Sequence, residues 1–355
     1  MPVYPLIKHI RKTALNYGTI RFGREMRRLL RDTTQRDVFR IDETTVGVTN
    51  GPLSKAILAA RPMHDFERIV FKPIRKQPVS KALFAAVMKA IGQDARRVAN
   101  DREPTAFDLR GVWPAKGHVY LRARLYSGDP WVVRAMASDM VNRSIGLQGM
   151  FETMSSRILA ARSLPQEASA LAKLTETLTG DERRLAITLY RRAAQSVCST
   201  VAGLVTSVLW LGVPFDQNAK LRDCIMETLR LLPPAWLFLR TPGKEFAELD
   251  HRIREADDVL VIPLLTQRDP AVWSEPDLYR PSRWESIDNP EAHDHYLPFG
   301  HGTDRCWARE LVLTLTEHIL REVVRQRLRV DPAMHSVTMP MRTLLTIARL
   351  DLVAA

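Results

Sequence analysis

The chain has 355 residues, of which 45% are hydrophobic and 26% charged, and its 52 basic side chains outnumber its 40 acidic ones to give a net charge of +12. This composition can bury a sizeable core, which excludes a disordered, collagen-like or low-complexity protein. Three cysteines are too few for a disulfide-stapled secreted fold. Because the N-terminus also shows no secretory signal pattern, we expect a cytoplasmic protein.

The first residues form a strongly basic segment. Residues 1–32 carry eight basic side chains against two acidic ones. Leu6, Ile10 and Ala14 recur every four positions, which predicts a partly amphipathic helix within residues 5–32. Its charge would suit nucleic acid, anionic lipid or an acidic protein, and equally a solvated helix face. We assign residues 1–35 to this helical segment and residues 36–355 to the main domain.

Short strands and helices are predicted next. Two runs of β-branched residues lie on either side of Asp42 and Glu43, which predicts a hairpin that ends at Asn50-Gly51. Helical patterns follow at 52–61 and 80–99. A loop rich in proline and glycine then extends to residue 117.

The central part is predicted to be mainly helical. Residues 131–192 contain few helix-breaking residues, and residues 193–215 carry no charge. The uncharged segment is long enough to cross a bilayer. It contains several polar residues, however, and no positive cluster is confined to one flank. We therefore interpret it as a helix through a large globular core and expect no transmembrane segment.

The C-terminal part combines helices, short strands and one long loop. A helix is predicted to end at Pro233-Pro234, and residues 259–265 are β-like. An irregular stretch from Thr266 to Pro298 follows, and long ordered loops of this kind are usually functional. It leads to PFGHGTDRC, which ends at Cys306, and then to a predicted helix of about twenty residues.

Cys306 is the strongest candidate for chemistry. It directly precedes a predicted helix, whose free N–H groups favour thiolate over thiol. A thiolate there could be a nucleophile, with His301 as the nearest base, or a soft metal ligand; a buried inert cysteine fits the same pattern. Zinc is poorly supported because no second cysteine or histidine pair stands at ligand spacing. A single cysteine suffices for haem, since the porphyrin supplies four ligands.

Four motifs resemble those of the cytochrome P450 family. FGHGTDRC at 299–306 is similar to the haem-binding loop, in which the cysteine thiolate is the proximal ligand of haem iron. ETLR at 227–230, followed by LLPP, resembles the family's Glu-x-x-Arg element, and PSRW at 281–284 resembles the segment that returns an arginine to it. QRDP at 267–270 is similar to the family's Asn-Arg-Asp-Pro run. The resemblance implies a buried Glu227–Arg230–Arg283 triad that locks the cysteine loop.

The resemblance also implies a fold and a cofactor site. The expected fold is mainly α with small β-sheets, a single P450-like domain over residues 36–355 with haem b between a distal helix and the helix after the cysteine loop. Its haem-contacting residues are expected to be Cys306 on the iron, Phe299 in the loop, and Arg240, Arg305, His118 and Arg122 near the propionates.

The sequence departs from the family at two places. Asp304 stands where an arginine or histidine usually meets a propionate, so we expect either Arg305 to take over that contact or Asp304 to point away. In the distal helix, valine replaces the acid of the proton relay, at Val197 in the preferred register and at Val205 in the alternative. Ser199 and Thr200 are then the candidate catalytic residues, with Thr206 in the alternative register.

The leading hypothesis is a P450 monooxygenase that oxidises a small organic or secondary-metabolite substrate, bulky or carrier-tethered, with electrons from an acidic ferredoxin or flavodoxin-type partner. Arg305 and Arg309 are expected on or near the docking surface. The alternatives are a P450-like enzyme that uses peroxide or rearranges a pre-oxidised substrate, and a degenerate haem-binding protein. A nucleic-acid binder is disfavoured because the chain lacks a reading motif.

Overall fold

The structure is a computed structural model that describes residues 19–21, 37–60, 79–102, 105–125, 169–212, 220–240, 242–302, 305–331, 338–340, 345, 347 and 349–355. Its contacts divide the chain into two compact units. The first unit comprises residues 1–65, 206–309 and 330–350, and the second comprises residues 66–205, 310–329 and 351–355. The boundary expected after residue 35 lies outside the described residues.

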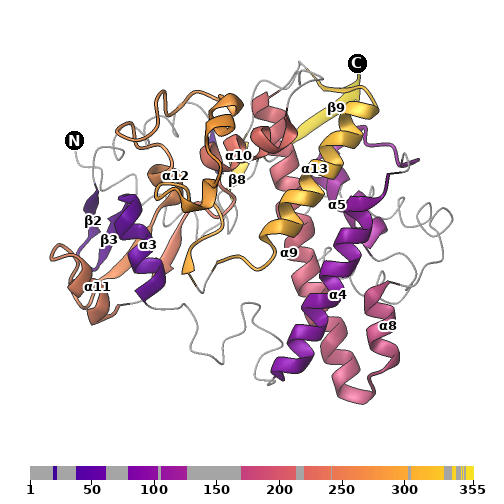
Figure 1. The fold of residues 1–355 in the computed structure, drawn as a ribbon, viewed down its shortest axis with the longest axis horizontal. Helices are drawn as coiled ribbons and strands as arrows, with labels where there is room; N and C mark the ends of the chain where they lie inside the picture. The colour runs from indigo at the N-terminus through magenta and orange to yellow at the C-terminus, as the bar shows by residue number, and fades with distance from the viewer. Residues whose placement is uncertain are drawn as a thin grey trace. The chain divides into compact units, whose positions relative to one another are not determined.

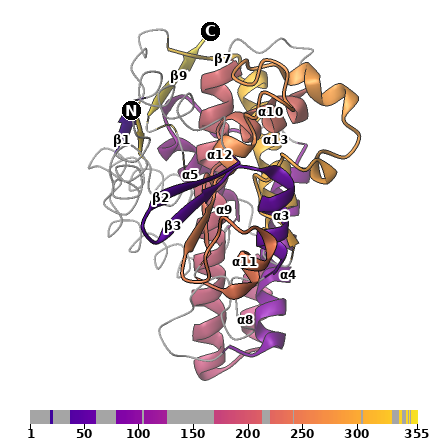
Figure 2. The same ribbon diagram turned by 90° about the vertical axis from the view of Figure 1, so that its left-hand side faces the viewer.

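The first unit is built on a four-stranded sheet with the order β2-β3-β6-β5. Strands β2 (Val38–Asp42) and β3 (Thr45–Val48) form an antiparallel hairpin, which confirms the hairpin predicted from the sequence. Strand β6 (Asp258–Val261) pairs parallel to β3, and β5 (Phe238–Arg240) pairs antiparallel to β6. In Figure 2 the hairpin faces the viewer.

Alternating side chains give this sheet two apolar faces. On one face, Val46 and Val48 of β3 pack with helices α3 (Gly51–Ala60) and α11 (Lys244–Leu249). On the other face, Phe39 and Ile41 of β2 join a cluster that includes the end of α10 (Leu221–Leu231). Both clusters lie in the first unit, so the sheet is buried between two layers.

The long loop of the first unit contains short helical turns. Helix α12 (Pro263–Thr266) follows β6, and the 3₁₀ turns η1 (Pro281–Ser286) and η2 (Pro290–Ala292) lie between it and the cysteine loop. The predicted strand over 259–265 therefore ends early. The reason is Pro263, which cannot donate a ladder hydrogen bond but suits the first turn of a helix.

The second unit is mainly helical. It contains α4 (Lys81–Asn100), α5 (Ala115–Leu125), α8 (Ala170–Glu176) and most of α9 (Gly180–Gly212) and α13 (Arg309–Arg325). Helix α4 lies against both α8 and α5 (Figure 1). A three-stranded sheet of order β4-β9-β7 comprises Gly111–Trp113, Leu350–Ala354 and Leu328–Val330.

Close packing joins α5 to α9 in this unit. A Cβ atom built on Gly117 would lie 3.0 Å from the Cβ of Ala202 and 2.5 Å from the Trp113 ring, so only glycine fits there. The most apolar helical span of the described residues, Leu185–Gly212 in α9, is long enough to cross a bilayer, but 67% of its most apolar window is buried inside the protein. This burial favours its interpretation as a core helix.

The N-terminal prediction needs one correction. Of residues 1–35 the structure describes only Thr19–Arg21, which form strand β1 and pair antiparallel with β8 (Thr338–Pro340). The expected helix over residues 5–32 is therefore wrong at this point. Thr19 and Ile20 are β-branched and lie between Gly18 and Gly23, a local sequence that favours a short strand. The helix predicted over 131–192 lies outside the described residues as far as residue 168.

Candidate functional site

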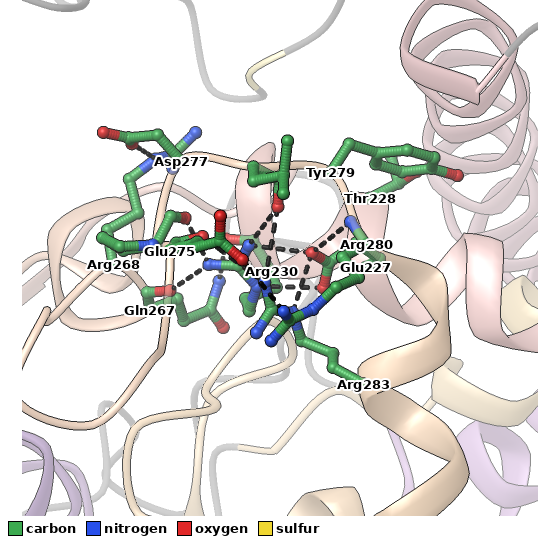
Figure 3. A network of polar contacts seen from close by, with 12 residues as sticks. Glu227, Thr228, Arg230, Gln267, Arg268, Glu275, Asp277, Tyr279, Arg280 and Arg283 are labelled. Atoms are coloured by element: carbon green, nitrogen blue, oxygen red, sulfur yellow. Dashed lines mark hydrogen bonds and ion pairs between the residues drawn. The ribbon is translucent and has the colours of Figure 1, made fainter.

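A buried carboxylate lies at the centre of the first unit. Glu227 and Arg230 share one face of α10, and both side chains have no exposed surface. Arg230 donates from Nε to Glu227 Oε2 at 2.9 Å and from Nη2 to Oε1 at 2.8 Å. Arg283 of η1 donates from Nε to Oε1 at 3.0 Å. The predicted Glu227–Arg230–Arg283 triad is confirmed (Figure 3).

Two further groups donate to the same carboxylate. Trp284 Nε1 donates to Oε2 at 3.0 Å, and the backbone N–H of Arg280 donates to Oε1 at 3.0 Å. The sequence motif contained Trp284 but gave it no role. Burial raises the pKa of Glu227, but the hydrogen bonds and positive charges of Arg230 and Arg283 outweigh it, and the pKa is lowered. Glu227 is therefore a buried anion at neutral pH.

The remaining N–H groups of Arg230 fix the long loop. Nη1 donates to the carbonyl oxygens of Gln267 and Pro276 at 3.0 and 2.7 Å, and Nη2 donates to that of Leu278 at 3.3 Å. With the two bonds to Glu227, all five guanidinium donors have partners. The guanidinium also lies 5.3 Å from the centre of the Trp273 ring. One side chain thus ties α10 to several turns of the loop.

Gln267 connects α10 to the start of the cysteine segment. Its Nε2 donates to the carbonyl oxygens of Leu229 and Arg230 at 2.9 and 3.0 Å, which satisfies carbonyls at the end of α10. Its Oε1 accepts the backbone N–H of Leu297 at 2.8 Å. The amide is fully buried. Gln267 therefore links the Glu227 network to Leu297, which lies immediately before the PFG sequence.

The cysteine loop turns through two glycines in the left-handed region. Gly300 and Gly302 have φ values of 75° and 65°, which other residues adopt only with strain. The loop closes where the backbone N–H of Cys306 donates to the carbonyl oxygen of Phe299 at 2.9 Å. Both side chains are half-buried. The predicted helix begins at Arg309, and Cys306 is separated from it by one turn.

The expectation of a thiol acidified by the helix needs correction. Burial raises the pKa of Cys306, and the opposing effects of the Ala308 and Arg309 backbone groups and of the Arg309 charge do not compensate for it. The physical reason is that removing a thiolate from water costs more than a few backbone dipoles return. A cation bound to sulfur reverses this balance, because a coordinating thiol is deprotonated outright.

Arg305 has an ion-pair partner within the first unit. Its Nη2 forms an ion pair with Glu291 Oε2, and Arg309 Nε lies 2.6 Å from the other oxygen of the same carboxylate. Glu291 belongs to η2 and was not identified from the sequence, because a lone glutamate in a loop carries no motif. Asp304 lies outside the described residues. The expectation that Arg305 takes over the propionate contact, or that Asp304 points away from it, stays a prediction.

The other expected haem contacts are distributed over both units. Arg240 lies in β5 of the first unit, with its side chain buried. His118 and Arg122 lie one turn apart on α5 of the second unit, so they share a helix face. Burial, reinforced by the charge of Arg122, lowers the pKa of His118 to about 4. His118 is therefore neutral at physiological pH.

The candidate relay residues lie on α9, Ser199 and Thr200 in the second unit and Thr206 at the start of the first unit's second segment. Ser199 and Thr200 are half-buried, and Val197 is buried. Thr206, the residue of the alternative register, is fully buried. The two registers therefore differ in accessibility: only the first presents hydroxyl groups that are partly exposed.

A family model described as "Cytochrome P450" matches residues 220–343, the part of the chain that holds α10, the long loop and Cys306. Over these residues the chain is thus similar to the cytochrome P450 family. The matched residues include the Glu227 network and the cysteine loop.

Curated relatives of this chain match over short segments. Cyclooctatin synthase from Streptomyces melanosporofaciens is 43% identical over 81 residues, which are 22% of this chain and 18% of that protein. Fusicoccadiene C-8 hydroxylase from Phomopsis amygdali is 38% identical over 93 residues, 26% of this chain and 18% of that protein. The matched segments thus span less than a fifth of either relative's length.

Solved P450 structures agree over almost the whole chain. The open cytochrome P450 EryK from S. erythraea superposes with a TM-score of 0.59 and 16% identity, over 93% of this chain and 96% of that one. An unusual P450-like monooxygenase of microbial secondary metabolism gives a TM-score of 0.58 and 19% identity, over 92% and 98%. These similarities confirm the predicted fold class, mainly α with small β-sheets.

The donor set of this chain fits haem b, the cofactor of the cytochrome P450 family. Among the described residues no three histidine, cysteine, aspartate or glutamate side chains gather to hold a metal ion. A single half-buried thiol in a rigid loop therefore suits an iron whose porphyrin supplies the other in-plane ligands. Of the three cysteines, Cys198 and Cys224 are buried in helices and only Cys306 is partly accessible.

Proposed function

We propose that this protein is a P450 monooxygenase that uses O₂ and electrons from a redox partner to oxidise a small organic substrate. The observation that carries the proposal is the continuous set of contacts from Glu227 and Arg230 through Gln267 to Leu297 and the Cys306 loop. When bound, haem supplies the oxygen chemistry, and the protein orients it. Cys306 would hold the iron, and its thiolate would favour O–O cleavage.

The cationic residues have distinct roles in this proposal. Arg122 and Arg240 would supply the positive charge for the propionates, as guanidinium groups suit carboxylates. His118, with a pKa of about 4, would donate a neutral hydrogen bond rather than form an ion pair. Arg305 already forms an ion pair with Glu291. It would contact a propionate only if it left the Glu291 carboxylate.

Proton delivery is assigned to α9. Ser199 and Thr200 are the proposed relay residues, supported by their partial exposure, which a group that moves protons to a pocket requires. Val197 contributes only a buried apolar side chain. This replacement favours a second candidate function, in which the same haem site uses peroxide or rearranges a pre-oxidised substrate and needs no carboxylate relay.

The proposed substrate is a secondary metabolite, because a structural neighbour is described as a P450-like monooxygenase of microbial secondary metabolism. That this substrate is bulky or carrier-tethered stays an expectation from the sequence. The proposed electron donor is an acidic ferredoxin or flavodoxin, and the proposed location is the cytoplasm. The support for the donor is the basic charge of Arg305 and Arg309 around Cys306, which Glu291 partly neutralises.

The test of the haem-thiolate assignment is spectroscopic. The reduced protein under carbon monoxide should give the red-shifted Soret band that thiolate ligation produces. Cys306→Ala should lose this band, and the matched control Cys224→Ala should keep it, because Cys224 is a buried residue of α10. Haem binding without that band in the unsubstituted protein would refute thiolate ligation.

The test of the reaction compares two sources of oxygen. Turnover of fusicoccadiene, the compound named in one relative, is measured with O₂, NADPH, a ferredoxin and its reductase, and separately with hydrogen peroxide. We expect hydroxylated product in the first assay. Product with peroxide alone would favour the second candidate, and Ser199→Ala should then have no effect.

A further inference from the structure

Two arginines flank Cys306 and share one carboxylate. Arg305 immediately precedes the cysteine, and Arg309 begins α13 three residues after it. Glu291 binds both, with Oε2 paired to Arg305 and Oε1 2.6 Å from Arg309 Nε. The three side chains are only 24–35% exposed. The carboxylate therefore bridges the two ends of the segment that presents the sulfur.

Glu291 itself is held on a rigid support. It lies in η2, whose first residue is Pro290. On the next turn, Lys55 of α3 donates to the carbonyl oxygen of Ala292 at 3.0 Å and to Asp294 Oδ1 at 2.9 Å. The two Lys55 hydrogen bonds thus tie the residues that follow Glu291 to α3, and Glu291 in turn contacts the cysteine loop.

The support also reaches the buried network. The His293 ring stacks on the Trp273 ring with centroids 4.5 Å apart. Trp273 in turn lies under the guanidinium groups of Arg230 and Arg283, at 5.3 and 5.9 Å. The segment that holds Glu291 and His293 thus contacts the Glu227 network through Trp273 and the cysteine loop through Glu291. These contacts do not involve Gln267.

We propose that Glu291 is a positioning residue that clamps the Cys306 loop by bridging Arg305 and Arg309. The inference rests on the proposed role of Cys306 as the iron ligand. The clamp gives Arg305 and Arg309 a structural task in addition to any contact with a redox partner. A negative charge that binds one arginine on each side of the sulfur restricts the loop in a way that a single ion pair does not.

Hydrogen–deuterium exchange of the haem-loaded protein tests the clamp directly. The amide of Cys306, bonded to Phe299 O, reports opening of the loop. We expect Glu291→Gln to accelerate its exchange about tenfold, as the loss of a half-buried double ion pair should. Glu285→Gln is the matched control, since Glu285 makes a single exposed ion pair with Lys220 at 3.4 Å. An unchanged rate in Glu291→Gln would overturn the proposal.

A double-mutant cycle separates a bridge from a general charge effect. Arg309→Gln is combined with Glu291→Gln, and exchange at Cys306 is measured for all four proteins. The clamp predicts that the second substitution adds little once the first is made. Fully additive effects would refute it. Glu291→Asp, which keeps the charge on a shorter side chain, should restore part of the protection.

The carbon monoxide spectrum gives an independent readout. At a urea concentration that leaves the unsubstituted protein intact, Glu291→Gln should lose the thiolate band faster than Glu285→Gln. Equal loss in both variants would contradict the clamp. If the unsubstituted protein binds haem without a thiolate band, the proposed function fails, whereas the exchange experiment still decides whether Glu291 holds the loop.

Discussion

Substitution of Glu227 by glutamine offers the sharpest test of how the first unit is held together. The change keeps the shape of the side chain and removes its charge. In the native protein Oε1 accepts three hydrogen bonds and Oε2 accepts two, from Arg230, Arg283, Trp284 and the backbone of Arg280. A glutamine amide has only one oxygen, so its NH₂ group must face at least two of these donors.

The expected cost follows from these contacts. A hydrogen bond to a charged group contributes about 1.5–3 kcal/mol, and two are replaced by donor–donor contacts. The guanidinium of Arg230 is fully buried and loses its counter-charge. Breaking a buried pair by removing one partner costs about 3–5 kcal/mol. We therefore expect the free energy of unfolding to fall by about 4 kcal/mol, a large share of the about 5–15 kcal/mol that proteins possess.

Urea unfolding monitored by tryptophan fluorescence measures this loss, because Trp273 and Trp284 lie at the network with ring centroids 5.7 Å apart. Glu285→Gln, at an exposed site, should change the free energy of unfolding by less than about 0.5 kcal/mol. A loss below about 1 kcal/mol in Glu227→Gln would refute the reasoning. Replacing Arg230 as well should not rescue stability, since the carbonyl oxygens of Gln267 and Pro276 would then lose the hydrogen bonds from Arg230.

Three further predictions concern other parts of the molecule. Burial lowers the pKa of His318 to about 4, so the imidazole of the unfolded state binds a proton at a higher pH than that of the folded state. The free energy of unfolding should therefore fall by up to about 3 kcal/mol as the pH decreases from about 6.5 to 4. His318→Gln should flatten that part of the pH–stability profile measured by urea unfolding. Tyr190→Phe removes the hydroxyl that donates to buried Asp94 at 2.5 Å and should cost about 1–3 kcal/mol by thermal unfolding; an unchanged midpoint would show that this bond is not stabilising. Gly302→Ala should weaken the cysteine loop by about 1–2 kcal/mol through its φ of 65° alone, because a Cβ there makes only ordinary contacts of 3.4 Å or more; mass-spectrometric exchange at Cys306 would detect it, and protection equal to that of the unsubstituted protein would contradict it.

Local patterns predicted several elements because their causes are local. The hairpin at 38–49, the helices α3, α4 and α10 and the helix after Cys306 all follow from periodicity and breaking residues close in sequence. The prediction failed at Thr19–Arg21, where pairing with Thr338–Pro340 makes the strand. The local sequence between Gly18 and Gly23 favours a short strand, but the pairing partner that forms it lies far away in the sequence, outside any local window.

The sequence by itself determined the cysteine and its glycines, and the resemblance of its motifs to the P450 family predicted the Glu227–Arg230–Arg283 triad. Only the tertiary structure decided what surrounds them. It brought Gln267 to Leu297 and Glu291 to Arg305 and Arg309. It also raised the pKa of Cys306, against the expectation from the helix start, because burial depends on every neighbour in space and a helix terminus depends only on neighbours in sequence.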